Sequence, residues 1–378
     1  MRAVTFQQPL QVAVEEVAIP EISDPRAVVV KTQLAALCGS DLHIYRGAEA
    51  GLDVGAIQGH EFVGHVHAVG DEVTSLKVGD AVMSPFTTSC GECFFCVQNM
   101  SARCTAGGLF GWRQDGGGLH GGQAEYVLVP MAETTLIKRP ENVKPEHALL
   151  MGDILATAFY CAIRGDVGTP WTPDVLSESG AGPCESHGES DVVVVVGCGP
   201  VGLLTVACAV YLSQGKSKVV AIDCVPERLE AAKRMGAAKS VNFKMEDAAA
   251  VVRELSSSKR GARVVLEVVG QRSAMQLAYA CVQPGGTLSS VGVHAYEPNA
   301  ITPDEFYDKN LTFRSGRCPV RSLLVGGAMP HLRAILEATP EADALFTHRI
   351  GFADAADAYK KFNAAEDGMI KCLIDPTL

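Results

Sequence analysis

The stretch that decides the fold is DVVVVVGCGPVGLLTVA, at residues 191–207. Its run of valines is typical of a strand buried on both faces, and the apolar run that follows predicts a helix. Between them Gly197, Gly199 and Gly202 form the spacing G-x-G-x-x-G. Such glycines permit a tight turn and let the backbone approach a pyrophosphate at the helix N-terminus. The flanking strand and helix make this motif more specific than the glycines alone.

Downstream of this stretch, predicted strands alternate with predicted helices. KVVAID at 218–223, ARVVLEVVG at 262–270 and GTLSSVGV at 286–293 have the composition of buried strands, and PERLEAAKRMG at 226–236 is an amphipathic helix. This alternation predicts a parallel sheet with crossover helices. We therefore expect a Rossmann-type, doubly wound α/β domain at residues 156–300.

Asp223 stands at the end of KVVAID, where a carboxylate can accept hydrogen bonds from the adenine-ribose hydroxyls and repel a 2′-phosphate. The sequence therefore favours NAD over NADP. Arg228 leaves the alternative open, because an arginine just beyond this strand could reach a 2′-phosphate, although it could equally be a solvated helix residue.

Residues 165–190 are rich in Gly, Pro, Ser and acidic residues and contain no Lys or Arg. They predict a long surface insertion within the α/β domain, with a lid or an oligomer contact as the functional alternative.

The first part of the chain has a different pattern. Short β-branched runs punctuated by glycine, such as VVVKT at 28–32 and EFVGHVHAV at 61–69, predict a compact β-rich unit. After residue 300, further strand-like segments at 310–317, 345–352 and 369–376 are most simply interpreted as returning to it. We expect this second domain to comprise residues 1–155 and 301–378.

Composition agrees with two packed domains and excludes some partners. The chain has 378 residues, of which 47% are hydrophobic and 20% charged, as in globular proteins that exceed a single core. A net charge of −11 and no basic cluster argue against nucleic acid or an anionic membrane as partner. The start, MRAVTFQQPL, has no signal-type apolar run, and we expect a cytoplasmic protein.

Four cysteines form the strongest chemical motif. Cys90, Cys93, Cys96 and Cys104 have the spacing C-x2-C-x2-C-x7-C in a loop at about residues 88–106. Four thiolates at such spacing can surround one tetrahedral zinc, and a site closed by four protein ligands is structural. An iron–sulfur site is the alternative, but the spacing differs from the usual bacterial run and the following proline is missing.

A second group begins with Cys38 in CGSDLH and His60 in GHEFVGHVHAVG. Both lie at the ends of predicted β segments. Alone, these two are half a metal site, and each could instead be an ordinary buried residue.

At this point the chain resembles the zinc-containing alcohol dehydrogenases of the medium-chain dehydrogenase/reductase superfamily. Residues 59–73 fit the family's zinc signature, GHE-x2-G-x5-G-x2 followed by a small apolar residue. CGSD, the four-cysteine loop and the dinucleotide fingerprint complete a set that covers nearly the whole chain in the family's order. The resemblance implies that the β-rich unit is a GroES-like catalytic domain.

The resemblance also implies roles for the residues around Cys38. With His60 and Asp153 it would hold a catalytic zinc, and Glu61 would be the nearby carboxylate that approaches the metal during ligand exchange. Many relatives have cysteine at the third ligand position, and the aspartate is similar to the formaldehyde dehydrogenase-like and secondary-alcohol branches. From the residues alone, Asp153 could instead be a helix N-cap before ILATAF.

Further family positions map onto this sequence. Ser40 and His43 match the proton relay, and Asp41 the carboxylate that fixes the ring of His60. Phe86 matches a substrate-pocket position, although it could be a plain core residue. The remaining matches imply contacts with the cofactor, and for Lys371 a substitute pyrophosphate contact: Thr157, Pro200, Val201, Val268, Val291 and Lys371.

We therefore expect an NAD-dependent oxidoreductase with two zinc ions per chain that converts a primary, secondary or polyol alcohol into an aldehyde or ketone. The resemblance also implies a homodimer or a homotetramer, and nothing in the residues distinguishes the two. Two alternatives stay open: a zinc-independent quinone or enoyl reductase of the same superfamily, and a non-catalytic dinucleotide-binding sensor. The first lacks the cysteine loop and the zinc ligands, and the second would have lost the relay. Metal content of the purified protein distinguishes them.

Overall fold

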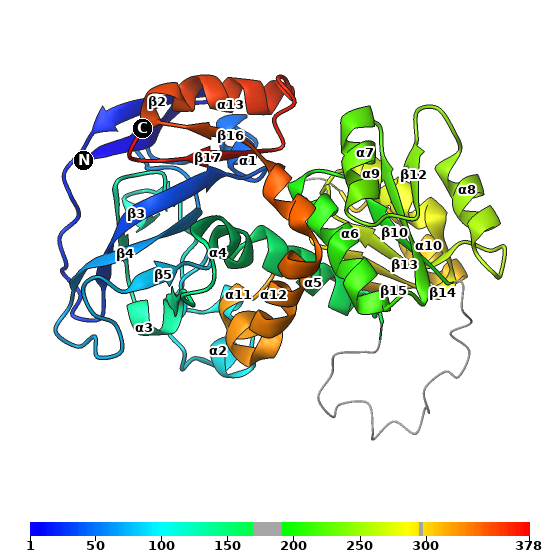
Figure 1. Cartoon of the computed structure of the whole chain (residues 1–378), viewed down its shortest axis with the longest axis horizontal. Helices are drawn as coiled ribbons and strands as arrows, with labels where there is room; N and C mark the ends of the chain where they lie inside the picture. The colour runs from blue at the N-terminus through cyan, green and yellow to red at the C-terminus, as the bar shows by residue number, and fades with distance from the viewer. Residues whose placement is uncertain (169–190, 295–297) are drawn as a thin grey trace. The chain divides into compact units, whose positions relative to one another are not determined.

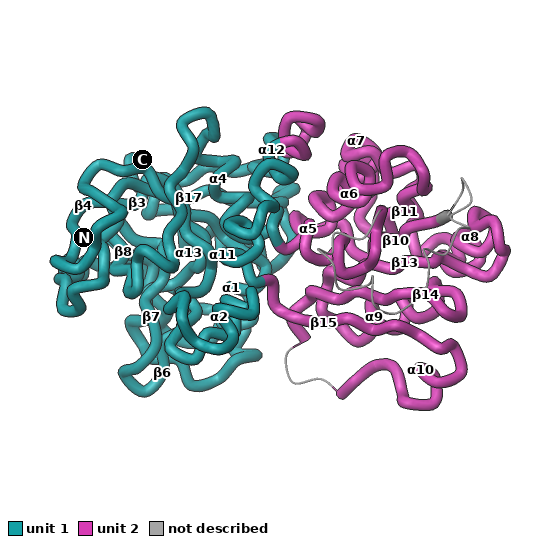
Figure 2. Tube along the Cα trace, turned by 90° about the horizontal axis from the view of Figure 1, so that it is seen from below, with its two compact units in different colours: residues 1–156, 319–333, 343–378 teal, residues 157–318, 334–342 magenta. Residues whose placement is uncertain are grey.

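The computed structural model describes residues 1–168, 191–294 and 298–378 (Figure 1). The chain forms two compact units (Figure 2), of which unit 1 comprises residues 1–156, 319–333 and 343–378 and unit 2 comprises residues 157–318 and 334–342. Most of the insertion predicted at 165–190 lies outside the described residues.

Unit 2 is built on a six-stranded parallel sheet in the order β12-β11-β10-β13-β14-β15. The chain runs outward from β10 in one direction and then from β13 in the other, so the switch point lies between these two strands. Its strands are β10 (Asp191–Val196), β11 (Ser217–Asp223), β12 (Lys239–Asn242), β13 (Ala262–Glu267), β14 (Val282–Ser290) and β15 (Thr312–Ser315). The connecting helices are α6 (Pro200–Ser213), α7 (Pro226–Arg234), α8 (Ala248–Leu255), α9 (Arg272–Cys281) and α10 (Pro303–Lys309).

The core of unit 2 explains the valine run that identified it. Val192, Val194 and Val196 of β10 are each at most 3% exposed and belong to one apolar cluster with residues of α8 and α9. Val193 and Val195, on the opposite face, are equally buried. A strand covered on both faces has no polar side, as the sequence predicted.

Unit 1 contains a seven-stranded sheet in the order β16-β17-β3-β4-β5-β9, with β8 also paired to β3. These strands are β3 (Val28–Leu37), β4 (Glu61–Val69), β5 (Ala81–Met83), β8 (Tyr126–Val129), β9 (Ile137–Lys138), β16 (Phe346–Ile350) and β17 (Lys371–Ile374). Two antiparallel hairpins accompany it: β1 (Arg2–Gln8) with β2 (Gln11–Glu16), and β6 (Trp112–Gln114) with β7 (Gly117–Leu119). Helices of unit 1 are α1 (Asp41–Tyr45), α2 (Phe94–Val97), α3 (Ala132–Thr135), α4 (Pro145–Gly152), α11 (Val320–Leu323) and α13 (Ala355–Ala364). Two more helices, α5 (Ile154–Arg164) and α12 (Met329–Ala338), begin in unit 1 and continue into unit 2.

The C-terminal part of the chain completes the sheet of unit 1. β17 pairs antiparallel with β3, and Ala355, Ala358 and Tyr359 of α13 belong to the same buried cluster as the valines of β3. The sheet therefore joins the first and last segments of the sequence.

One predicted boundary is wrong. Residues 301–318 belong to unit 2, because β15 pairs in parallel with β14; residues 334–342 are also assigned there. β15 has only four residues, TFRS, and three of them are exposed. An edge strand of this kind lacks the continuous apolar run that marks a buried parallel strand. The predicted α/β class is confirmed.

Among the described residues, no single helix is long and apolar enough to cross a membrane; α4 and α5 pass the length and composition test only as a pair, bent by 45°.

Candidate active site and metal centres

Four side chains from three distant segments converge in unit 1. Cys38 follows β3, His60 and Glu61 stand at the start of β4, and Asp153 lies between α4 and α5. One potential ligand atom from each lies within 4.8 Å of the others. All four residues are at most 8% exposed. The predicted set of Cys38, His60 and Asp153, with Glu61 beside it, is thus brought together.

The break between α4 and α5 places Asp153. The sequence at 147–163 reads as one apolar helical stretch, but Asp153 has φ −148° and ψ −84°, and the two helices meet at 45°. Its carboxylate Oδ2 lies 3.3 Å from His60 Nε2 and 3.7 Å from Cys38 Sγ. The side chain is therefore committed to the cluster.

The electrostatics of the cluster suit a cation. Burial raises the pKa of the Cys38 thiol, and it raises the pKa of Glu61 to about 7 despite the neighbouring Lys371. Burial also opposes ionisation of His60, but Asp41 and Cys38 lift its pKa well above the usual value. Several acids packed out of water are costly unless a positive charge compensates them. Thiolate, imidazole and carboxylate are the three ligand types that bind zinc, so the donor set fits this metal.

Further residues that the resemblance assigns to the site have the following surroundings. Asp41 Oδ1 is 3.0 Å from His60 Nδ1, so the carboxylate accepts a hydrogen bond from the ring and turns Nε2 toward the cluster. Ser40 Oγ lies 3.3 Å from both Cys38 Sγ and His60 Nε2. The ring of Phe86 meets that of His60 edge-on, with centroids 6.2 Å apart. His43 is partly buried, which lowers its pKa.

Lys371 has a different partner from the one predicted. It is 1% exposed, and its Nζ lies 2.5 Å from each carboxylate oxygen of Glu61. The ammonium group of Lys371 forms an ion pair with Glu61 here. Its inferred contact with the cofactor pyrophosphate stays a prediction. The two residues are 310 positions apart, so no local pattern could reveal the pair.

The four-cysteine loop forms a second cluster in unit 1. The sulfurs of Cys90, Cys93, Cys96 and Cys104 lie within 4.8 Å of one another, and all four residues are partly exposed. Backbone N–H groups point at the sulfurs: Cys90 N donates to Cys104 Sγ at 3.2 Å and Cys93 N to Cys90 Sγ at 3.4 Å. Backbone hydrogen bonds lower the pKa of Cys93 to about 6. Four such sulfurs fit a closed tetrahedral zinc site.

The loop is tied to other parts of unit 1. Ser101 and Ser322 exchange hydrogen bonds between backbone N–H and hydroxyl, and Arg321 donates to the carbonyls of Glu133 and Thr134.

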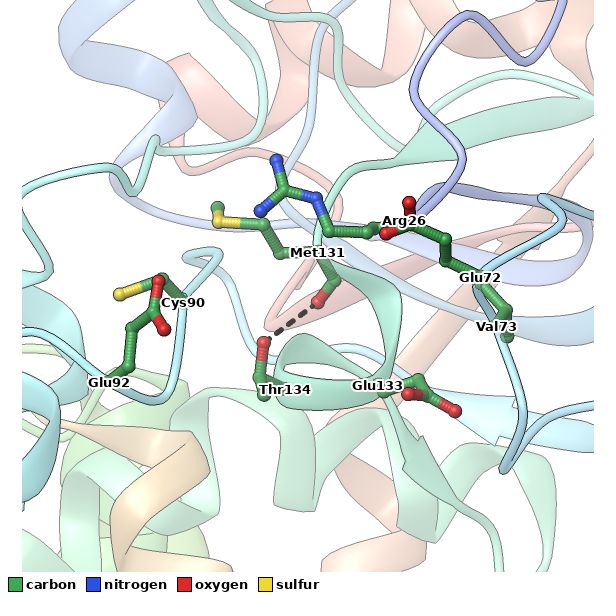
Figure 3. A pocket seen from close by; sticks show the side chains of 8 residues that line it. All are labelled: Arg26, Glu72, Val73, Cys90, Glu92, Met131, Glu133 and Thr134. Carbon is green, nitrogen blue, oxygen red and sulfur yellow. Dashed lines mark hydrogen bonds between the residues drawn. The ribbon is translucent and has the colours of Figure 1, made fainter.

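Beside the loop lies a pocket of about 180 Å³ (Figure 3). Arg26 lines it together with three glutamates and Cys90, and none of the four residues of the buried cluster does: Arg26, Glu72, Val73, Cys90, Glu92, Met131, Glu133, Thr134. This pocket is therefore separate from the buried cluster.

Unit 2 carries the glycine motif in the predicted context. β10 ends at Val196, Gly197 has φ +96°, and Gly199 precedes Pro200, the first residue of α6. A Cβ on Gly202 would lie 1.9 Å from the carbonyl oxygen of Gly197, so this glycine is required for the close turn. A Cβ on Gly199 would meet nothing within 4 Å, which leaves open space at the helix N-terminus, where a phosphate can approach.

Asp223 ends β11 beside this loop. Its Oδ2 accepts a hydrogen bond from Cys198 N at 2.7 Å, and its Oδ1 accepts from Cys224 N and Val225 N. The carboxylate thus holds the glycine loop in place and keeps accepting capacity for a further donor. Burial and the Asp223 carboxylate raise the pKa of Cys198, and the partly buried Arg228 of α7 opposes this rise, which places its charge near the loop.

The other predicted cofactor residues also lie in unit 2: Val268 and Val291 directly follow β13 and β14, Val201 lies in the first turn of α6, and Thr157 lies in α5. All are partly exposed: Thr157, Val201, Val268 and Val291. Sequence reasoning missed Glu267, which is fully buried next to Val268. Its carboxylate accepts from Val269 N, Gly270 N and the Ser290 hydroxyl, and lies 3.3 Å from His294 Nε2. The sequence signal that could have revealed it is an acidic residue at the end of the buried strand β13.

Taken together, a parallel nucleotide-binding sheet and a β-rich unit with two zinc-type clusters define a metal-dependent oxidoreductase of the two-domain dehydrogenase kind. Sequence profiles agree: the alcohol dehydrogenase GroES-like domain matches residues 24–141, and the zinc-binding dehydrogenase profile matches residues 200–322. The zinc-type alcohol dehydrogenase B of Aspergillus flavus is 40% identical over 96% of this chain and 79% of its own length. The chain belongs to the zinc-type alcohol dehydrogenase family.

Solved structures agree with this assignment. The alcohol dehydrogenase TADH from Thermus sp. ATN1 is 35% identical, covers 99% of both chains and has a TM-score of 0.85. An Escherichia coli CFT073 alcohol dehydrogenase, determined in complex with NADH, is 26% identical, covers 99% of both chains and has a TM-score of 0.78.

Proposed function

We propose that this protein transfers a hydride between an alcohol and NAD, giving an aldehyde or ketone, with a catalytic zinc held by Cys38, His60 and Asp153. The convergence of these three buried side chains carries the proposal. Three protein ligands leave a fourth position for substrate. A second zinc, held by the four-cysteine loop, would be structural. We further propose a homodimer or homotetramer, following the family resemblance.

The chain's own residues prepare the chemistry. When bound, zinc supplies Lewis-acid polarisation of the substrate oxygen. Asp41 fixes the orientation of His60, and the hydroxyl of Ser40 stands beside Cys38 and His60, where it can accept and pass on a proton from the substrate hydroxyl. His43, neutral because burial lowers its pKa, can take that proton. Phe86 supplies an apolar wall at the cluster.

The cofactor proposal rests on unit 2. The glycine loop leaves space for a pyrophosphate at the N-terminus of α6, and Asp223 can accept from a ribose hydroxyl and repel a 2′-phosphate. The NADH complex of the Escherichia coli relative supports a nicotinamide cofactor of this kind. We therefore infer NAD rather than NADP, and expect Glu267 to support the backbone beside Val268 and Val291.

The test compares wild type with Asp153→Ala and Asp153→Cys in NAD reduction against primary, secondary and polyol alcohols, with zinc content measured in parallel. Asp153→Ala is expected to lose one zinc and at least about a thousandfold in turnover, because Lewis-acid stabilisation contributes several kcal/mol. Asp153→Cys keeps a ligand that zinc accepts and should retain the metal.

Asp357→Ala is the matched control, since this exposed carboxylate of α13 pairs only with Lys361 among the described contacts. It should behave as wild type. If zinc-loaded wild type reduces neither NAD nor NADP with any alcohol, the substrate class is wrong and a binding role must be considered. Full activity of metal-depleted protein would favour the zinc-independent reductase instead.

A further inference from the structure

A buried chain of hydrogen bonds continues behind the ligand His60 to the C-terminal helix of unit 1. Tyr359 Oη of α13 donates to Gln123 Oε1 at 2.9 Å, and Gln123 Nε2 approaches Asp41 Oδ2 at 3.4 Å. Asp41 in turn holds His60 Nδ1 at 3.0 Å. Tyr359 and Gln123 are both 0% exposed and Asp41 is 2% exposed. Water cannot substitute for these contacts without entering the core.

The donors and acceptors of this chain leave one orientation for the amide of Gln123. Its nitrogen faces two acceptors, the carbonyl oxygen of Ala36 at 3.3 Å and the Asp41 carboxylate. If the amide were flipped, its oxygen would face both of them, and a buried acceptor would lack a donor. In this orientation the Tyr359 hydroxyl donates to the amide oxygen, and because burial raises the pKa of Tyr359 well above the usual value, the hydroxyl keeps its proton.

The backbone makes room for this side chain next to the metal ligand. Gly59, directly before His60, has φ +84°, and a Cβ there would lie 2.4 Å from the Gln123 side chain. Gln123 is also anchored by its own backbone: its N–H donates to Gln58 O, and its carbonyl accepts from Val4 N. The glutamine is therefore locked against the segment that presents His60.

From this geometry we propose that Gln123 and Tyr359 are positioning residues for the catalytic metal site, acting through Asp41 on the orientation of His60. Asp41 has its Oδ2 committed to Cys38 N at 2.9 Å and to Gln123, so its Oδ1 is left for the ring. Through Cys38 N and His60 Nδ1, one carboxylate sets two of the expected ligands. Outer contacts of this type tune metal affinity. The inference rests on the proposed zinc site.

The experiment measures zinc release to a chromophoric chelator from the intact, zinc-loaded chain. The release phase missing in Asp153→Ala identifies the catalytic site, and the four-cysteine site of the same molecule serves as internal reference. Loss of a contact beside a metal ligand costs about 10- to 100-fold in affinity. Gln123 and Tyr359 act on His60 only through Asp41, so we expect a smaller effect: Tyr359→Phe and Gln123→Met should speed release of the catalytic zinc by about three- to tenfold. Gln123→Glu, which sets a second carboxylate against Asp41, should have the largest effect.

Tyr45→Phe is the matched control. Tyr45 packs on Tyr359 with ring centroids 5.3 Å apart and is also buried, but its hydroxyl is not part of the hydrogen-bond series from Tyr359 to His60. It should release zinc as wild type does. A purely structural role for Gln123 and Tyr359 would speed release from both zinc sites together, and that result, or unchanged catalytic release in all three variants, would overturn the proposal. If wild type itself lacks an Asp153-dependent zinc, the proposed function fails instead.

Discussion

Removing the buried lysine next to the metal cluster tests the electrostatic account of this site. In Lys371→Met the ammonium group is lost while the length of the side chain is kept. Its Nζ lies 2.5 Å from both oxygens of Glu61, and the two side chains are 1% and 0% exposed. At this separation the attraction is about 7 kcal/mol for an effective dielectric of about 20. Desolvation of both ions offsets part of it, and breaking buried pairs usually costs about 3–5 kcal/mol.

Glu61 can escape part of this cost by taking up a proton. Burial raises its pKa to about 7 even with Lys371 present, and the loss of the lysine raises the pKa further. A carboxyl group with a raised pKa contributes stability below its unfolded value, 4.5, and loses that contribution as pH rises through the folded value. The deficit of Lys371→Met in free energy of unfolding should therefore be larger at pH 8 than at pH 6, by about 1 kcal/mol or more.

The assay is urea-induced unfolding of wild type, Lys371→Met and the double variant Glu61→Gln/Lys371→Met under the same zinc concentration. Replacing both charges leaves no uncompensated ion, so the double variant should recover most of the loss at pH 8. A deficit below about 1 kcal/mol for Lys371→Met, or one that Glu61→Gln does not reduce, would refute the reasoning.

Two further changes test the other parts of the molecule. Cys96→Ser removes one of the four sulfurs of the cysteine loop. The variant should contain one zinc fewer per chain and have a lower Tm, while it keeps the zinc that depends on Asp153. Loss of both zinc ions together would contradict two separate sites. Asp223→Asn keeps one acceptor for the N–H groups of the glycine loop but removes the negative charge. The KM for NAD should rise about tenfold, and the preference for NAD over NADP should become smaller. If steady-state kinetics show an unchanged preference, Arg228 or another group determines the choice of cofactor.

Local motifs were predictable from the sequence because their physics is local. The four cysteines lie in one short loop, and the glycine turn lies between the strand and the helix that it joins. Asp153 is different: it stands 115 residues from Cys38, and only family resemblance indicated that they meet. The kink that delivers it does not follow from an apolar run that periodicity assigns to one helix.

The supporting contacts were beyond any sequence pattern. Gln123 and Tyr359 are 236 residues apart, and Glu61 and Lys371 are 310 apart. Spacing within a segment carries no information about such pairs, and a buried lysine on a strand is contrary to its usual preference for the surface. The edge strand β15 was assigned to the wrong domain for a related reason, since its exposed residues lack the signature of a buried parallel strand.

The two proposed metal centres therefore differ in how they form. The four-cysteine cluster draws its ligands from one loop, and that loop's own backbone donates hydrogen bonds to the sulfurs. Metal can therefore organise the four cysteines before the rest of unit 1 is in place. The buried cluster needs β3, β4 and the α4–α5 break for its ligands, and α13 and β17 for Tyr359 and Lys371. Since β17 pairs with β3 directly before Cys38, with Leu37 opposite Cys372, the proposed catalytic centre is complete only when the C-terminal segment has joined the sheet.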